Sequence, residues 1–182
     1  MAFHGTKKSV ADKLVAGQPF GPSSNDDDWL GHGVYFWEFA PQQAWWWAER
    51  RYGAANAAVV GSLLRLGRCI DLLDPRNAGL LRESHADLEK TMRAAGARMP
   101  RNANTHKYRD CAVFNWLYAR LGAAGYAVES CRAVFVLQSG GMPRLWERSG
   151  VFDGAHIQIC VRQPENILAV WHVRKDGRYG QD

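Results

Sequence analysis

The sequence predicts a single α+β domain spanning residues 1–182. Segments rich in aromatic and β-branched residues lie towards both ends of the chain, and segments with helical periodicity lie between them. Strands and helices therefore do not alternate regularly, which favours a mixed α+β domain over a parallel doubly wound one. A chain of 182 residues is also of ordinary length for one core.

The first elements follow from local signals. Residues 1–5 predict a short strand that ends at a glycine, and residues 6–17 predict a helix closed by Gly17, a good C-cap residue. Residues 33–39, GVYFWEF, predict a strand from their aromatic and β-branched content. Pro41 then suits the first turn of a second helix.

The remaining elements are predicted in the same way. Residues 57–74 form one long strand candidate, interrupted by a glycine and stopped by an Asp-Pro pair. A helix is predicted over 77–96, after the Asp-Pro pair, and amphipathic spacing predicts another over 106–122. Three further strands are predicted over 132–138, 156–163 and 167–173.

Composition narrows the class of protein. Hydrophobic residues make up 47% and charged residues 23% of the chain, and no apolar run is long enough to cross a bilayer. The N-terminus does not read as a secretory signal, so we expect a cytoplasmic protein without membrane contact. The formal charge of +5 allows attraction to a polyanion but is too small to identify a nucleic-acid binder.

The four cysteines are spaced singly among apolar residues, without a C-x-x-C pair or a histidine at zinc spacing. We interpret them as reduced core thiols and expect no metal site. They are Cys69, Cys111, Cys131 and Cys160.

Two glycine-containing motifs carry the functional signal. His4-Gly5-Thr6 and Gly31-x-Gly33-x-Tyr35-Phe36 are both predicted to end strands at a glycine, where a ligand can approach the backbone. A helix with three consecutive tryptophans, residues 45–47, follows the second motif. Successive helical residues are about 100° apart, so one or two of these tryptophans must be core. Tyr35 and Trp46 could sandwich a flat heteroaromatic ring.

In order and content these motifs resemble the poly(ADP-ribose) polymerase and diphtheria-toxin-like ADP-ribosyltransferases, the group with a His-Tyr-Glu set of site residues. The resemblance covers residues 1–50 clearly and the last third of the chain loosely. It implies a split pair of antiparallel sheets with an NAD cleft between them and flanking helices. NAD would be a substrate.

The resemblance also implies roles. His4 would hydrogen-bond the ribose hydroxyls of NAD, the backbone of Gly5 would hold the nicotinamide carboxamide, and Tyr35 and Trp46 would stack on the ring. Gln43 falls where the family has a serine that touches the carboxamide, and its amide can donate and accept there. The implied NAD-binding residues are His4, Gly5, Thr6, Gly33, Tyr35, Phe36, Gln43 and Trp46.

The third family position departs from the pattern. The family has a glutamate on a late strand, and the matching residue here is Gln158 in HIQICVR. Glutamine can hold a ribose but cannot stabilise a cationic transition state as a carboxylate does. The implied catalytic set is His4, Tyr35 and Gln158. The alternative is a displaced carboxylate, for which Glu147, Asp153 and Glu165 are the candidates.

The glutamine at this position disfavours poly(ADP-ribose) synthesis. Transfer of one ADP-ribose unit to a macromolecule, or hydrolysis of NAD, remains compatible with it. The resemblance further implies a toxin or defence role with a neutralising partner protein. The target is left open between protein and nucleic acid. The glycine-rich loop 139–150, with Arg144, Trp146 and Arg148, would suit either target.

Two alternatives stay open. One is an NAD-dependent RNA 2′-phosphotransferase-like enzyme, which predicts arginines along the cleft. The other is a module that binds NAD or ADP-ribose without transferase activity, which the glutamine makes credible. The remaining histidines show no partner in the sequence and are interpreted as structurally unremarkable: His32, His85, His106, His156 and His172.

Overall fold

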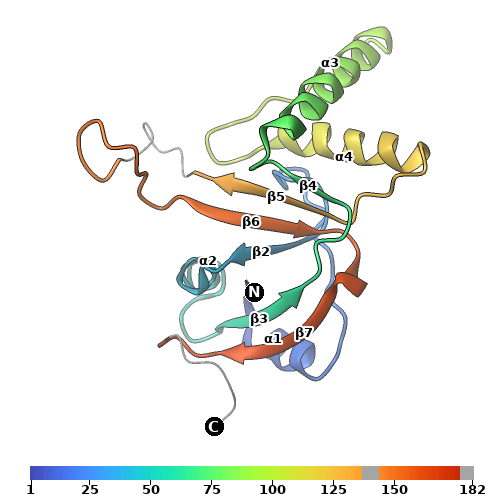
Figure 1. The fold of residues 1–182 in the computed structure, drawn as a ribbon. Helices are drawn as coiled ribbons and strands as arrows, with labels where there is room; N and C mark the ends of the chain where they lie inside the picture. The colour runs from blue at the N-terminus through green and yellow to red at the C-terminus, as the bar shows by residue number, and fades with distance from the viewer. Residues whose placement is uncertain (137–143, 177–182) are drawn as a thin grey trace.

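The computed structural model describes residues 1–136 and 144–176 (Figure 1). Its strands are β1 (Ala2–Lys7), β2 (Val34–Glu38), β3 (Ala57–Leu64), β4 (Cys69–Asp71), β5 (Ser130–Phe135), β6 (His156–Val161) and β7 (Ile167–Val173). In the described residues they form a seven-stranded sheet in the order β4-β5-β6-β2-β1-β3-β7. The β4–β5 pair is parallel and the other neighbouring strands are antiparallel. The α+β prediction is therefore confirmed.

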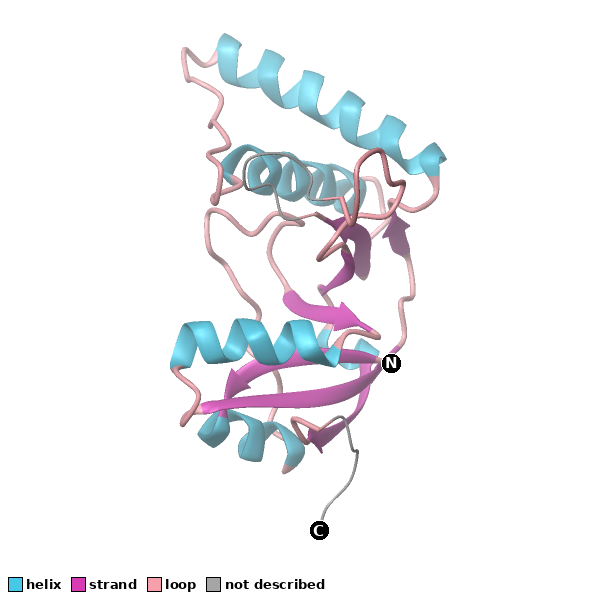
Figure 2. Ribbon diagram, turned by 90° about the vertical axis from the view of Figure 1, so that its left-hand side faces the viewer, coloured by secondary structure: helices cyan, strands magenta, loops and turns pink. Residues whose placement is uncertain are grey.

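The helices cover both faces of this sheet. They are α1 (Lys8–Val15), α2 (Pro41–Tyr52), α3 (Ala78–Ala94) and α4 (Tyr108–Ala123), with short 3-10 turns at Pro75–Asn77 and Pro164–Asn166. Figure 2 shows β3 and β7 running between α2 on one side and α1 on the other, and Figure 1 shows α3 lying outside α4. None of the helices in the described ranges is long and apolar enough to span a membrane.

The apolar residues gather under these helices. One core cluster joins α1 to the sheet through Leu14, Phe20 and Phe36, and a second lies beneath α4. A third cluster joins α2 to the sheet through Phe3 and Trp37. Because strand residues alternate between faces, Phe36 and Trp37 fall in clusters on opposite sides of β2.

Two predicted boundaries were wrong. Strand β1 continues through Gly5 to Lys7, so α1 begins at Lys8 and the His-Gly motif lies in mid-strand. Likewise Gly33 precedes β2 and bridges to Ser23 rather than ending a strand. In both places the pairing of the backbone with neighbouring segments overrides the local glycine signal.

The predicted long strand over 57–74 was also wrong, because it is two strands at different places in the sheet. Strand β3 pairs with β1 and β7, whereas β4 pairs with β5 at the opposite edge. The chain turns between them at Gly67, whose φ of 59° suits glycine. Residues 57–74 therefore run from the β1 side of the sheet to the edge beside β5.

The other predicted elements agree with the structure. The helices predicted over 77–96 and 106–122 correspond to α3 and α4, and the strand predicted over 167–173 is β7. The strand predicted over 132–138 corresponds to β5, and its residues 137–138 lie outside the described residues. All four cysteines are free thiols, and Cys69 is the one that is not fully buried.

Candidate functional site

The pairing between β1 and β2 is the shortest in the described sheet. Strand β1 pairs with β3 along its whole length, and β2 pairs with β6 along its whole length. In the described residues the β1–β2 ladder holds two pairs, Ala2 with Glu38 and Phe3 with Trp37. Beyond Phe3 the two strands part, and His4, Gly5 and Tyr35 lie at this parting.

Backbone groups of Gly5 and Tyr35 face this parting. The N–H of Phe39 donates to the carbonyl of Met1 at 3.3 Å, so these two residues form a hydrogen-bonded pair. In an antiparallel ladder such pairs recur at every second residue. Gly5 and Tyr35 would be the next hydrogen-bonded pair after Phe3 and Trp37, but the ladder ends before them. The amide and carbonyl of Gly5 are thus directed towards the backbone of Tyr35 without a ladder between them, and the Tyr35 carbonyl is in contact with His4.

His4 lies at the same place. Its Nδ1 is 2.8 Å from the carbonyl oxygen of Tyr35. Because a carbonyl oxygen only accepts, this contact assigns the proton to Nδ1 and leaves Nε2 as an acceptor. The ring packs against Phe20 and Phe36, with centroids 5.3 and 5.6 Å away. Burial lowers the pKa of His4, which keeps the imidazole neutral near pH 7.

Tyr35 is held by its hydroxyl group. The hydroxyl donates to the carbonyl of Gly31 at 2.8 Å and accepts from the N–H of Leu30 at 2.9 Å. Burial raises the pKa of the phenol, so it stays protonated. The ring packs in the cluster beneath α4. Tyr35 therefore fixes the turn before β2 and offers its backbone to the parting.

Gln158 lies on the next strand, opposite Trp37 in the β2–β6 ladder. Its side-chain oxygen accepts from the indole N–H of Trp29 at 2.8 Å, and its nitrogen is 3.0 Å from Nε2 of His156. Nδ1 of His156 is 2.8 Å from the carbonyl of Gly154 and so carries the proton. The amide of Gln158 must then donate to Nε2 of His156. This chain of hydrogen bonds fixes the orientation of the amide and leaves it one further N–H.

Aromatic rings surround that amide. The ring of Phe135 lies 5.1 Å from Trp29 and 5.2 Å from His156, and the ring of Trp37 lies 6.5 Å from His156. We call Trp29, Trp37, Phe135 and His156 the aromatic rim. Gln158 itself is 8% exposed. A buried amide in an aromatic setting can hold a sugar hydroxyl or an amide of a flat ligand.

The aromatic rim was not identified from the sequence, and His156, for which the sequence shows no partner, contacts the amide of Gln158. His156 and Gln158 are two positions apart in one strand, which places both side chains on the same face. That spacing was a usable signal. Trp29 is 129 positions from Gln158 in the chain, and its part in the site follows only from the sheet.

The two histidines predict a pH dependence of stability. Burial lowers the pKa of His4 and of His156 below their ordinary value of 6.5. Below pH 6.5 the unfolded chain therefore binds more protons than the folded chain, and stability falls as the pH falls. Thermal unfolding from pH 7.5 to 5.0 should show this loss. His156→Gln, which cannot titrate, should lose less. Parallel profiles for the two proteins would contradict the assignment.

The candidate carboxylates lie elsewhere. Glu147 and Asp153 are exposed in the segment before β6, and Glu165 is exposed in the turn after it. Within the described part of the chain, the hydrogen-bond partners of the Gln158 side chain are Trp29 and His156. Glu38, a carboxylate of β2, forms an ion pair with Arg132 at 2.7 Å and belongs to the opposite face of that strand from Trp37.

The predicted ring sandwich is not formed. Trp46 is 49% exposed on the outer side of α2, where Arg50 lies over its ring, whereas Tyr35 packs beneath α4. Trp45 and Trp47 are the tryptophans of α2 that pack against the core, and the Trp47 ring lies 5.8 Å from that of Trp37. Gln43 is half-buried on the same helix. The structure thus brings His4, Gly5 and Tyr35 together and leaves Trp46 apart from them.

The glycines of the two motifs have close packing partners. A Cβ on Gly5 would lie 2.5 Å from the carbonyl oxygen of Ala44, and one on Gly33 would lie 2.5 Å from Sγ of Cys160. Both positions therefore require glycine for packing, whatever they bind. Thr6 and Phe36 are buried, with 5% and 0% exposure, and Phe36 reaches the site through its contact with His4.

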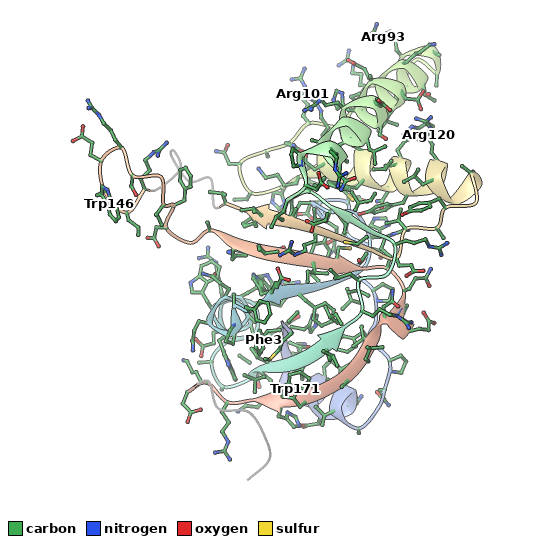
Figure 3. The ribbon with its side chains drawn as sticks, in the orientation of Figure 1. Phe3, Arg93, Arg101, Arg120, Trp146 and Trp171 are labelled. Atoms are coloured by element: carbon green, nitrogen blue, oxygen red, sulfur yellow. The ribbon has the colours of Figure 1, made fainter. Side chains whose placement is uncertain are left out.

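The segment before β6 is partly described. Residues 139–143 of the predicted target loop lie outside the described residues. Trp146 is 63% exposed, as expected, and Figure 3 shows it standing away from the sheet. Arg144 lies over the ring of Phe152 at 4.8 Å, and Arg148 pairs with Glu147 at 3.7 Å.

In the described residues no three His, Cys, Asp or Glu side chains are grouped closely enough to hold a metal ion. No protein-family model, no curated protein and no solved structure matches the chain.

Proposed function

We propose that this protein is an NAD-dependent mono-ADP-ribosyltransferase, with its site at the parting of β1 and β2. The observation that carries the proposal is the end of the β1–β2 ladder before Gly5 and Tyr35, with His4 anchored beside it. A central strand seldom leaves its backbone groups without a neighbouring strand, because unpaired polar groups are costly when buried. A ligand with matching donors and acceptors would satisfy them.

The nicotinamide carboxamide has such a set. It offers one carbonyl and one NH₂ group, which complement the N–H and C=O of Gly5. The Nε2 of His4 would accept from a ribose hydroxyl. The His4 ring packs against Phe36, on the opposite face of β2 from Gln158, so a ligand would have to pass between β1 and β2 to receive the remaining N–H of Gln158. Backbone donors and neutral side chains thereby orient the ligand without any charged group.

In the reaction the bond between ribose C1′ and the nicotinamide nitrogen breaks, and its electron pair leaves with nicotinamide, which becomes neutral. A nucleophile on the target then bonds to C1′, and its proton is released to solvent. Because Gln158 cannot supply negative charge to the cationic transition state, we expect slow turnover and transfer of one unit. Such an activity inside a cell would be damaging, so the proposal includes a toxin or defence role with a neutralising partner.

The second candidate function is binding of NAD or ADP-ribose without transfer. It is favoured by the neutral, fully oriented amide of Gln158, which in the described residues has no carboxylate partner. The RNA 2′-phosphotransferase alternative is less well supported, since aromatic rings rather than arginines surround that amide.

Nicotinamide release from NAD tests the proposal. The purified protein should release nicotinamide, and cell extract should raise the rate if ADP-ribose is transferred to a target. His4→Ala should reduce release about 100-fold, because the ribose loses its acceptor and the Tyr35 carbonyl loses its donor.

The control is His85→Ala, which makes the same change on α3 and should leave release unaltered. Isothermal titration with NAD accompanies each assay. Binding of NAD without nicotinamide release, with or without extract, would reject the transferase and support the binding module. Absence of NAD binding would reject both.

A further inference from the structure

A hollow lies at the far end of β1, away from the aromatic rim. It is lined by Lys7, Lys8, Ser9, Arg51, Tyr52 and Asn56, and its volume is about 680 Å³. These residues come from the end of β1, the start of α1, the last turn of α2 and the segment before β3. We call this site the basic hollow.

Positive charge is concentrated in the basic hollow. Lys7, Lys8 and Arg51 line it and no carboxylate does. Among the ion pairs of the described residues, these three cations have no partner, although other arginines of the chain do. Like charges around a concave surface raise the local potential and attract anions. Holding these three cations together lowers the free energy of unfolding, because they repel one another.

The remaining lining groups are hydrogen-bond donors. The N–H of Lys8 is used by the carbonyl of Asn56 at 2.9 Å, but the first turn of α1 has no side-chain cap and no acidic residue. Its next N–H groups and the hydroxyls of Ser9 and Tyr52 are therefore available to an acceptor. Lys7 lies 5.5 Å from the centre of the Tyr52 ring, which holds its side chain over the hollow.

We propose that the basic hollow binds a phosphate group of a nucleotide or a nucleic-acid strand. A phosphate offers several acceptor oxygens, which match an arginine, two lysines and free N–H groups at a helix start. The volume lies within the range of small-molecule sites, about 300–1,000 Å³, and exceeds what phosphate alone would fill. This inference does not require NAD cleavage, because none of the lining residues belongs to the candidate NAD site.

Titration of the ¹⁵N-labelled protein with pyrophosphate at 150 mM salt tests the proposal. Saturable shifts are expected at the amides of Lys8, Ser9 and Val10. The Lys8→Ala/Arg51→Ala variant should bind at least 10-fold more weakly. Lys90→Ala, which removes an exposed lysine of α3, should bind as the parent does. Shifts spread over all cationic residues without saturation, or equal affinity of the double variant, would overturn it.

Two further arms identify the source of the phosphate and separate this site from the NAD site. AMP and a five-nucleotide single-stranded RNA are titrated in the same way. Equal affinities would assign a mononucleotide, and tighter binding of the RNA would assign a strand. Pyrophosphate binding should persist at saturating NAD. Displacement by NAD would overturn the assignment of a separate site, whatever the outcome of the nicotinamide assay.

Discussion

Replacing Gln158 by glutamate is expected to raise the rate of nicotinamide release from NAD by roughly 100-fold. Departure of nicotinamide leaves positive charge on the ribose, and a carboxylate held in a water-poor site stabilises such charge by about 10²- to 10³-fold in rate. Gln158 is 8% exposed and already oriented by Trp29, so a carboxylate there would have a defined position. The measurement is initial-rate nicotinamide release at fixed NAD concentration.

The neighbouring histidine makes this prediction sharper. Nε2 of His156 accepts from the amide of Gln158, and a carboxylate cannot donate to it. In Gln158→Glu the histidine must therefore take up a proton and donate to the new carboxylate. We expect the pKa of His156, followed by NMR, to be raised in this variant above its value in the parent protein.

Gln158→Leu is the matched control, since it keeps a side chain of similar size without polar atoms. It should release no nicotinamide and should be less stable, because the buried N–H of Trp29 loses its acceptor. If Gln158→Glu folds and binds NAD but releases nicotinamide no faster than the parent, the transferase proposal fails at its chemical step.

Adding one methyl group at Gly5 is expected to cost about 3 kcal/mol of folding free energy. The new Cβ would lie 2.5 Å from the carbonyl oxygen of Ala44 and 3.2 Å from the Cβ of Ala48. These are backbone and near-backbone atoms of α2 that cannot rotate away, so the helix must move off β1. For a chain of this size we expect Gly5→Ala to lower Tm by roughly 6–12 °C.

Gly122→Ala is the control, because it adds the same atoms in α4 with nothing within 4 Å. It should leave Tm unchanged or raise it, since alanine is favoured over glycine in helices by about 1 kcal/mol. Differential scanning calorimetry of both variants decides the matter. Equal Tm values for Gly5→Ala and the parent would show that α2 does not rest on β1 as described.

The helix α2 shows what could be predicted from the sequence and what could not. Its start at Pro41 and the conflict among three consecutive tryptophans were readable from local rules. The sequence did not show which face of α2 turns towards the sheet, because Trp46 was chosen only for its spacing from Tyr35. The helix instead buries Ala44 and Ala48, four residues apart, against a strand that carries glycine. Because the side chains are small on both α2 and β1, the two elements can approach closely. The larger tryptophan rings lie beside this contact.

The candidate site, too, could be predicted only in part. His4, Gly5 and Tyr35 come together because each lies on β1 or β2, and their motifs were visible in the sequence. The partners of Gln158 depend on which strands are neighbours, and strand order is not encoded in any local pattern. Long-range pairing also separated β3 from β4, which the sequence presented as one apolar run.

The order of strands has a consequence for synthesis on the ribosome. Strands β1 and β2 are made first, yet the full-length neighbour of β2 is β6, which is completed only at Val161. Until then β2 is held to β1 by two residue pairs, and the amide of Gln158 is absent from the site. Strand β1 can pair with β3 once Leu64 has been made, but the other edge of β2 stays without its partner until β6 emerges. The candidate site can form only once the penultimate strand has emerged.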